Sequence, residues 1–356
     1  MSTNVPKTQR ALILPEKSGK FVVQTIEVPK PGEGEVLVRI ESTALNPIDV
    51  EMQEHGMFVE KYPAILGFDV AGVVAEIGQG VRNFAVGERV FFQSSAVDNR
   101  FAAYQQYAIS PVDLVFKIPA NISFDEAATL PVCLGTAVIG LYGDYTPNQE
   151  RSGLGLTPFW RDDGRTKYND EPIAVLSASA SVGQYVLQLA RLSGFSPIIA
   201  TASLHNAERL KSLGATHVIN RTLPISQIID EVRKITSKPF KFVYDAAASQ
   251  QLGLEILAPG GTLLTTTPPK GIDQAKVAAE KKTVAFVFGQ FAVPRYRKLA
   301  HELSPILPKL LESGEFKTNI PEYIPGGLLG VVEGLERFRQ HKVSGRKLVV
   351  HPPETQ

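Results

Sequence analysis

The chain has 356 residues, of which 44% are hydrophobic and 21% charged, so it is long enough to form two globular domains. Its formal net charge of +1 gives no indication of binding to nucleic acid or to an anionic membrane. A single cysteine, Cys133, excludes an internal disulfide, and together with a polar N-terminus and the lack of an apolar run of about 18 residues it predicts a cytoplasmic protein.

The first part of the chain is expected to form strands and turns. Three stretches rich in β-branched residues are bounded by Pro and Gly, namely residues 21–28, 35–40 and 70–78. Residues 123–142 are rich in helix formers, and Ser123 followed by Glu126 has the spacing of a capping box. The sequence therefore predicts a helix where the strand-rich part ends.

Residues 144–171 interrupt the pattern with a polar stretch that is rich in Gly and Pro and contains the only tryptophan, Trp160. A segment of this length without periodicity is uncommon inside a domain. It is either a solvated surface insertion or a lid over a functional site, and the sequence leaves both interpretations open.

From Pro172 onward, strands and helices alternate. The strands are expected at residues 172–177, 197–201, 217–219, 240–248 and 260–267, and the helices at residues 182–193, 207–214 and 225–235. Alternating units of this length predict an α/β fold with a doubly wound parallel sheet and right-handed crossovers. Residues 345–352 are expected to form a further strand that returns to the first domain.

The stretch "SASASVG", residues 177–183, lies where a dinucleotide-binding protein places its glycine-rich turn. Only Gly183 of the G-x-G-x-x-G pattern is in place. Small side chains, a preceding strand and a following helix remain, and a pyrophosphate needs the backbone N–H groups of such a helix N-terminus. Taken alone, the motif fits a dinucleotide site and an ordinary strand–helix turn equally well.

The end of the second expected strand favours NADP over NAD. An NAD site usually carries an acidic residue roughly 20 positions beyond the glycines, where it binds the ribose hydroxyls. This chain has Thr201, Ala202 and Ser203 there, and short hydroxyl side chains leave room for a 2′-phosphate. Positive charge is available nearby on His205, Arg209, Lys211 and Arg221. The alternative explanation is a solvated helix face, on which Lys and Arg are common.

Several stretches along nearly the whole chain resemble the medium-chain dehydrogenase/reductase superfamily. The resemblance is to its zinc-free quinone and enoyl reductases, including fungal proteins described as trans-acting enoyl reductases or zinc-binding alcohol dehydrogenase-like. The matching stretches include "ALNPIDV", "YPAILGFDVAGVVAEIGQGVRNFAVGERV", "AATLPVCLGTAVIGLY", "SASASVGQYVLQLARLSG", "LAPGGTLL" and "SGRKLVV". The resemblance implies a GroES-like β-rich catalytic domain (residues 1–130 with 320–356), a Rossmann NADP-binding domain (residues 131–319) and an active site in the cleft.

The resemblance also implies which residues contact the cofactor, NADPH. They are Asn46 and Thr136 near the nicotinamide; Ser179, Ala180, Ser181 and Val182 along the pyrophosphate; Ser203, His205, Asn206 and Arg221 around the 2′-phosphate; and Phe288, Gly289, Phe291 and Lys347 completing the pocket. The catalytic residues are not identified, and Asn46 and Thr136 are the nearest candidates. Enoyl reductase relatives often read Asn-Pro-x-Asp-Trp-Lys, whereas this chain has Asp49-Val50-Glu51, so an acyl-carrier specificity is not carried over.

The residues at the expected metal positions predict that no metal is bound. Zinc alcohol dehydrogenases of the superfamily have Cys where this chain has Asn46, and Gly-His-Glu where it has Gly67-Phe68-Asp69. A catalytic zinc site needs three protein ligands, and the six histidines show no metal-type spacing. Cys133 lies in an apolar stretch and is expected to be an inert core thiol.

Without zinc, reduction of a simple ketone or aldehyde lacks electrophilic assistance, whereas conjugate reduction needs only hydrogen-bond donors for the enolate. The expected function is therefore NADPH-dependent reduction of the C=C bond of an α,β-unsaturated carbonyl compound, or of a quinone. Tyr62, Tyr142 and Tyr145 offer hydroxyls, but each is better explained as a core or surface residue. The alternatives are a zinc-free carbonyl reductase and a non-catalytic NADPH-binding protein. The expected partner is a small-molecule substrate, and the chain is expected to be a monomer or a homodimer.

Overall fold

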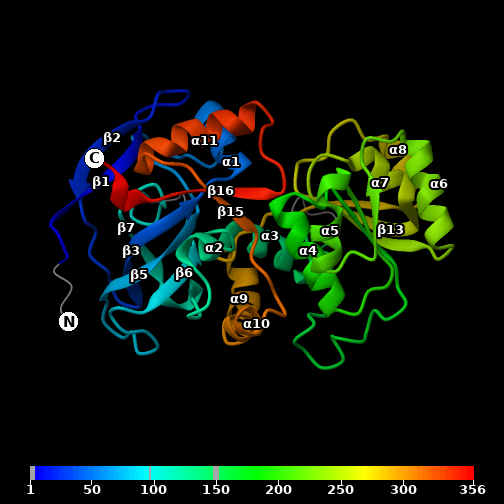
Figure 1. Cartoon of the computed structure of the whole chain (residues 1–356), viewed down its shortest axis with the longest axis horizontal. Coiled ribbons are helices and arrows are strands. Elements are labelled where there is room, and N and C mark those ends of the chain that lie inside the picture. Colours follow the sequence, from blue (N-terminus) through cyan, green and yellow to red (C-terminus); the bar gives the residue numbers. More distant parts are fainter. Residues whose placement is uncertain (1–4, 96–97, 147–151) are drawn as a thin grey trace. The chain divides into compact units, whose positions relative to one another are not determined.

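The computed structural model describes residues 5–95, 98–146 and 152–356, and these form two compact units. Unit 1 comprises residues 1–132 and 291–356, and unit 2 comprises residues 133–290. Each unit contains its own sheet and covering helices (Figure 1). No helix within the described ranges is long and apolar enough to cross a membrane.

Unit 1 is built around a seven-stranded sheet in the order β15-β16-β3-β5-β6-β8, with β7 beside β3, and a three-stranded sheet in the order β2-β1-β4. The strands expected at residues 21–28, 35–40 and 70–78 are confirmed as β2, β3 and β5. The bounds are β1 Thr8–Leu14, β2 Val22–Glu27, β3 Glu35–Ala44, β4 Ala64–Ile65, β5 Asp69–Ile77, β6 Arg89–Gln93, β7 Tyr107–Pro111, β8 Val115–Lys117, β15 Ile320–Tyr323 and β16 Arg346–Val350.

The helices of unit 1 pack against these sheets, and apolar side chains from β1, β16 and α11 share one buried core. Their bounds are α1 Pro47–His55, η1 Val112–Leu114, α2 Phe124–Ala128, η3 Pro294–Tyr296, α9 Arg297–Leu303, α10 Leu307–Ser313, η4 Gly327–Leu329, α11 Gly330–Arg339 and η5 Pro352–Glu354. The strand expected near the C-terminus is confirmed as β16, which pairs antiparallel with β3 and parallel with β15.

Residues 291–319 were expected in the second domain, but the structure groups them with unit 1. Two contacts give the physical reason. Arg297 of α9 forms an ion pair with Asp113 of η1 at 2.9 Å, and the Asn121 amide donates to the carbonyl oxygen of Leu311 at the end of α10 (3.2 Å). The segment between the sheet of unit 2 and β15 is thereby attached to the strand-rich unit.

The single helix expected over residues 123–142 is divided in two. Its start is as expected, because Ser123 Oγ accepts from the backbone N–H of Glu126 at 3.1 Å and the Glu126 carboxylate accepts from Ser123 N–H at 2.9 Å. Pro131 then ends the first helix, since proline lacks a backbone N–H and disfavours the helical conformation in the residue before it. Helix α3, Pro131–Tyr142, starts at this proline.

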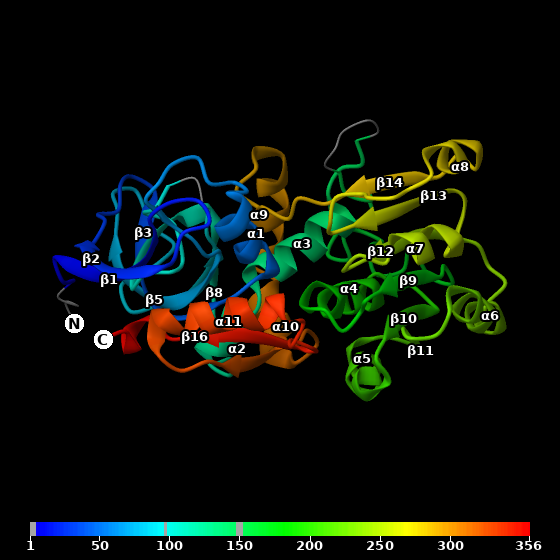
Figure 2. The ribbon, with the colours of Figure 1, turned by 90° about the horizontal axis from the view of Figure 1, so that it is seen from above.

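Unit 2 contains the parallel sheet that the alternating pattern predicts. Its strand order is β11-β10-β9-β12-β13-β14, all neighbours are parallel, and helices flank the sheet (Figure 2). The strand bounds are β9 Ile173–Leu176, β10 Ile198–Ala202, β11 His217–Asn220, β12 Phe240–Asp245, β13 Leu257–Thr265 and β14 Thr283–Phe286. The helix bounds are α4 Ser181–Leu192, η2 Leu204–Asn206, α5 Ala207–Leu213, α6 Ile225–Ile235, α7 Gln250–Ile256 and α8 Gln274–Ala279.

Residues 152–171 form no helix or strand, yet they are packed onto unit 2. The Ser152 N–H donates to the carbonyl oxygen of Phe286 on β14 at 3.0 Å. The ring of Tyr168 stacks on Phe195 with centroids 4.7 Å apart, and Trp160 meets Tyr142 of α3 edge-on. The segment is therefore only partly solvated: residues 152–154, 156, 158 and 159 are buried, whereas residues 161–163, 165–167, 169 and 170 are exposed, as a surface insertion predicts. The lid stays a prediction, and residues 147–151 lie outside the described part.

His351, which follows β16, forms contacts that attach the last residues of the chain to the rest of unit 1. Its Nε2 lies 2.8 Å from Asp125 Oδ1 at the start of α2, and its Nδ1 lies 2.8 Å from Glu354 Oε1 in η5. The imidazole also stacks on the ring of Tyr323 of β15. Burial alone would lower the pKa of His351, but hydrogen bonds to the two carboxylates raise it above its usual value.

We therefore expect His351→Gln to destabilise the protein more at pH 6 than at pH 9. Because the folded-state pKa is raised, the stabilisation is fully present below the ordinary value of 6.5 and is lost as pH rises through the folded-state value. The difference should stay below roughly 1 kcal/mol, since the pair is partly exposed to solvent. Urea denaturation of both proteins at the two pH values measures it, and an equal loss at both would contradict the prediction.

Candidate functional site

The turn between β9 and α4 has the close packing that a dinucleotide-binding turn requires. A Cβ atom added to Gly183 would lie 2.7 Å from the Cα and 2.8 Å from the carbonyl oxygen of Ala178. The first turn of α4 therefore packs directly on the end of β9, and no larger residue fits without moving the backbone. This is the role of the third glycine of the dinucleotide fingerprint.

Ser177 begins this turn with a positive φ of 52°, in the left-handed region that a non-glycine residue rarely adopts. Side chains around it support this conformation. Its N–H donates to Thr201 Oγ1 at 3.1 Å, and its hydroxyl lies 3.0 Å from both the carbonyl oxygen of Ala247 and Ser249 Oγ. The ends of β10 and β12 thus hold the start of the turn.

The structure brings together the four residues expected along the pyrophosphate. Ala180 is the N-cap of α4, a helix of 12 residues, and Ser179, Ser181 and Val182 flank it at the same helix start, each partly exposed. A helix N-terminus presents backbone N–H groups and the positive end of the helix dipole, both of which favour a bound anion. The residues present therefore fit a dinucleotide pyrophosphate.

The four residues expected around the 2′-phosphate also lie together, at the ends of β10 and β11. Arg221 Nε donates to Ser203 Oγ at 3.0 Å, and the Arg221 N–H donates to the carbonyl oxygen of Ala202. Asn206 Nδ2 lies 3.1 Å from His205 Nε2 in the short helix that follows β10. A guanidinium held against a serine hydroxyl at an exposed turn is a suitable arrangement for a phosphate.

The other two cations named from the sequence have different partners. Lys211 forms an exposed ion pair with Glu208 at 3.3 Å. Arg209 is half-buried, its Nε lies 3.4 Å from Gln184 Oε1, and burial lowers the pKa of its guanidinium. The sequence did not indicate Gln184, because a buried glutamine within a helix has no distinguishing local pattern.

Thr136 and Gly289, both expected near the cofactor, lie in contact in unit 2. A Cβ atom on Gly289 would lie 2.1 Å from Thr136 Oγ1, so only glycine fits at this position, which directly follows Phe288. The Tyr244 hydroxyl donates to the carbonyl oxygen of Thr136 at 3.0 Å and thereby attaches α3 to β12. Phe291 belongs to unit 1, where its N–H donates to Gln93 Oε1.

Unit 1 contains a buried polar network centred on Asn46 and Lys347. The Asn46 amide nitrogen donates to Asp69 Oδ2 at 2.8 Å, and its amide oxygen accepts a hydrogen bond from the Lys347 ammonium. Lys347 also forms an ion pair with the same Asp69 oxygen at 3.1 Å, and these two side chains are 3% and 0% exposed. Asp69 Oδ1 accepts from the backbone N–H of Val132 at 2.7 Å, so both carboxylate oxygens are used.

A second carboxylate adjoins this network and was not assigned a role from the sequence. Asp49 Oδ2 accepts from the Asn46 N–H at 2.7 Å and from the Tyr104 hydroxyl at 2.5 Å, while its Oδ1 has no hydrogen-bond partner. Burial raises the pKa of Asp49 to about 7, despite the opposing effect of the Tyr104 and Asn46 hydrogen bonds. Tyr104 is 58 positions from Asn46 in the chain, and no sequence pattern links the two.

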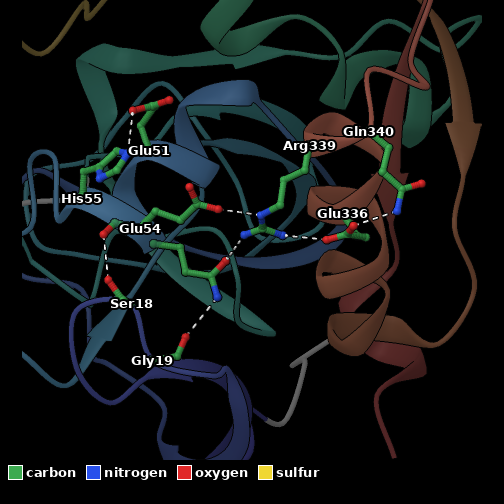
Figure 3. Close-up of polar contacts among 9 residues, drawn as sticks. Ser18, Gly19, Glu51, Glu54, His55, Glu336, Arg339 and Gln340 are labelled. Carbon is green, nitrogen blue, oxygen red and sulfur yellow. Dashed lines mark hydrogen bonds and ion pairs between the residues drawn. The ribbon is translucent and has the colours of Figure 1, made fainter.

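Helix α1, which follows its N-cap Asn46 and carries Asp49, is also fixed at its other end (Figure 3). Arg339 of α11 donates to Glu54 Oε1 at 2.6 Å and to Gln53 Oε1 at 2.7 Å. Gln53 in turn donates to the carbonyl oxygen of Gly19. These contacts fix the helix at both ends and so determine where the Asn46 amide lies within unit 1.

Comparisons with known proteins agree with this organisation. Residues 32–120 match the family model described as alcohol dehydrogenase GroES-like domain, and residues 181–304 match the one described as zinc-binding dehydrogenase. The chain is 31% identical to dehydrogenase orsE of Emericella nidulans, covering 96% of this chain and 99% of that protein. It is also 31% identical to trans-enoyl reductase BOA5 of Botryotinia fuckeliana, covering 94% and 97%.

Solved structures share the fold. A quinone oxidoreductase of Pseudomonas syringae has a TM-score of 0.76 at 21% identity, covering 96% of this chain and 99% of that one. A mycobacterial protein whose structure is complexed with NADPH has a TM-score of 0.76 at 21% identity, covering 97% and 100%. With relatives at this identity over nearly the full length, the resemblance seen in the sequence is confirmed: the chain belongs to the medium-chain dehydrogenase/reductase superfamily of oxidoreductases, on its enoyl reductase-like branch.

Proposed function

We propose that this chain is an NADPH-dependent reductase that transfers hydride to the C=C bond of an α,β-unsaturated carbonyl compound, or to a quinone, without zinc. The observation that carries the proposal is the Lys347 ammonium bonded to the Asn46 amide oxygen and to Asp69. Ammonium and amide N–H groups are the donor types that stabilise an enolate or a reduced quinone oxygen. The names of the relatives, trans-enoyl reductase and quinone oxidoreductase, support the same reaction class.

The proposed cofactor is NADPH. NADPH, when bound, supplies the hydride. Ser179 to Val182 at the start of α4 would hold its pyrophosphate, and Ser203 with Arg221 would hold its 2′-phosphate. No carboxylate occupies the end of β10, where an acidic residue would favour NADH, since Thr201, Ala202 and Ser203 stand there.

The matched family model is described as zinc-binding, but the residues at the expected metal positions, Asn46 and Phe68, do not suit a zinc ion. The Asn46 amide oxygen already accepts from the Lys347 ammonium, whose charge opposes a nearby divalent cation, and Phe68 offers only a buried apolar ring. Among the residues described, no group of three or more His, Cys, Asp and Glu side chains could hold a metal. We therefore assign the electrophilic assistance to hydrogen-bond donors.

Arg221→Met should weaken NADPH binding roughly 10- to 150-fold and NADH binding much less, because a charge-assisted contact to phosphate contributes about 1.5–3 kcal/mol. Lys211→Met is the matched control, since it removes the same charge from an exposed ion pair with Glu208. Titration of both cofactors by fluorescence measures the effect. Equal losses for NADPH and NADH in Arg221→Met, or equal affinity of the unmodified protein for the two, would refute the assignment.

Purified protein should contain well under one zinc per chain, and its turnover should survive prolonged treatment with a chelator. The physical reason is that Asn46 and Phe68 replace the ligand types that zinc requires. Elemental analysis and activity after dialysis against the chelator measure both quantities. Stoichiometric zinc together with loss of turnover would overturn the zinc-free mechanism.

The reaction itself is tested with NADPH deuterated at C4 and a simple enone. Deuterium should appear at the carbon β to the carbonyl group, and the carbonyl group should survive. Deuterium on the carbonyl carbon, with an allylic alcohol as product, would assign the protein as a carbonyl reductase. Tight NADPH binding without consumption of enones, quinones or aldehydes would instead support a non-catalytic cofactor-binding protein.

A further inference from the structure

We propose that Gln184 is a positioning residue for the dinucleotide pyrophosphate and acts through the backbone of the turn at residues 177–180. This inference rests on the proposed function, because it assumes that a dinucleotide binds at the start of α4. It goes beyond that function by assigning a role to a buried side chain that does not itself contact the cofactor.

The contacts of Gln184 connect the turn to a neighbouring helix. Its side-chain nitrogen Nε2 donates to the carbonyl oxygen of Ser179 at 3.0 Å, and its Oε1 lies 3.4 Å from Nε of Arg209 on α5. Gln184 is 1% exposed, so water does not compete for these bonds. The Gln184 amide thus links α5 to the carbonyl group of Ser179, the residue before the N-cap Ala180.

The turn needs such support because it contains no glycine before Gly183. Ser177 adopts a left-handed conformation, and Ser249 and Thr201 stabilise that first residue. Ser179 lies at the other end of the turn, where Gln184 is the side chain that holds its carbonyl group. The turn is therefore fixed at both ends by side-chain hydrogen bonds from outside it.

The position of the Ser179 carbonyl group affects which backbone N–H groups a bound pyrophosphate would contact. The N–H of Ala180 is already donated to the carbonyl oxygen of Ser177 at 2.9 Å, so it is used within the turn. The first turn of a helix is where an anion meets backbone N–H groups, and the direction of those groups follows from the peptide planes just before them. Donors that are already oriented before binding give higher affinity, because less conformational freedom is lost on association.

The test compares Gln184→Met with Gln188→Met. Gln188 is the matched control, since it is also 1% exposed and lies one helical turn further on, where its amide donates to the carbonyl oxygen of Gln184 rather than to the turn. Gln184→Met should raise the Kd for NADPH and for NADH by the same factor, about tenfold for one hydrogen bond. Gln188→Met should lose thermal stability to a similar extent but keep both Kd values.

The Kd values for NADPH and NADH together distinguish a role at the pyrophosphate from a role at the 2′-phosphate. Equal weakening of NADPH and NADH is expected because both carry the pyrophosphate, whereas Arg221→Met should affect NADPH selectively. Saturating NADPH should restore kcat in Gln184→Met, since only cofactor binding is altered. A Gln184→Met protein that binds both cofactors like Gln188→Met, or that loses only NADPH, would overturn the inference.

A second variant keeps the inference testable if Gln184→Met does not fold. Arg209→Lys retains the positive charge but lacks the Nε–H that faces Gln184 Oε1, so it should weaken both cofactors by a smaller common factor, roughly threefold. Unchanged binding of both cofactors by Arg209→Lys would then overturn the inference. If the unmodified protein binds no dinucleotide at all, the proposed function fails and this assignment fails with it. If the unmodified protein binds NADPH and NADH but the variants bind them equally well, only the role of Gln184 is refuted.

Discussion

The buried ion pair between Lys347 and Asp69 is the interaction on which the polar centre of unit 1 depends. It joins β16, close to the C-terminus, to β5, and the same carboxylate also accepts from the Asn46 amide and the Val132 N–H. Two charges are removed from water here, and such a pair persists only when hydrogen bonds satisfy the remaining polar atoms. Losing either partner would leave an unpaired buried charge, which typically costs about 3–5 kcal/mol.

In unit 2 the corresponding constraint is the backbone conformation of the turn between β9 and α4. A dinucleotide-type turn needs either glycines or external support, and this chain keeps only the glycine that allows α4 to approach β9. The other positions carry serine and alanine, and bonds from Thr201, Ser249 and Gln184 hold their conformation. The loss of glycines is therefore compensated by Thr201 and Ser249, which are distant in sequence, and by Gln184 of the following helix α4.

This explains how far the sequence could predict the molecule. Strands β9 to β13 and helices α4 to α6 were predictable because their apolar periodicity is local, whereas helices α7 and α8 were missed. The residues at the turn and at Ser203 to Asn206 were assigned to the cofactor by the family resemblance, and those roles stay predictions. Strand β14 was missed, as was the packing of residues 152–171, since both depend on the neighbours they meet. Pairs such as Asp49 with Tyr104 and Gln184 with Arg209 carry no local signal at all.

The cation that contacts Asn46 is the Lys347 ammonium, and this affects which reduction the site would favour. Direct reduction of a ketone places a full negative charge on one oxygen, which a Lewis acid stabilises most effectively. Conjugate reduction, or reduction of a quinone, spreads that charge over several atoms, so oriented N–H donors suffice. An ammonium fixed between Asn46 and Asp69 is such a donor and is partly neutralised by its partner carboxylate. Stabilisation by this network would suit a delocalised product anion better than a localised alkoxide, which is why we propose a reductase of activated alkenes or quinones rather than an alcohol dehydrogenase.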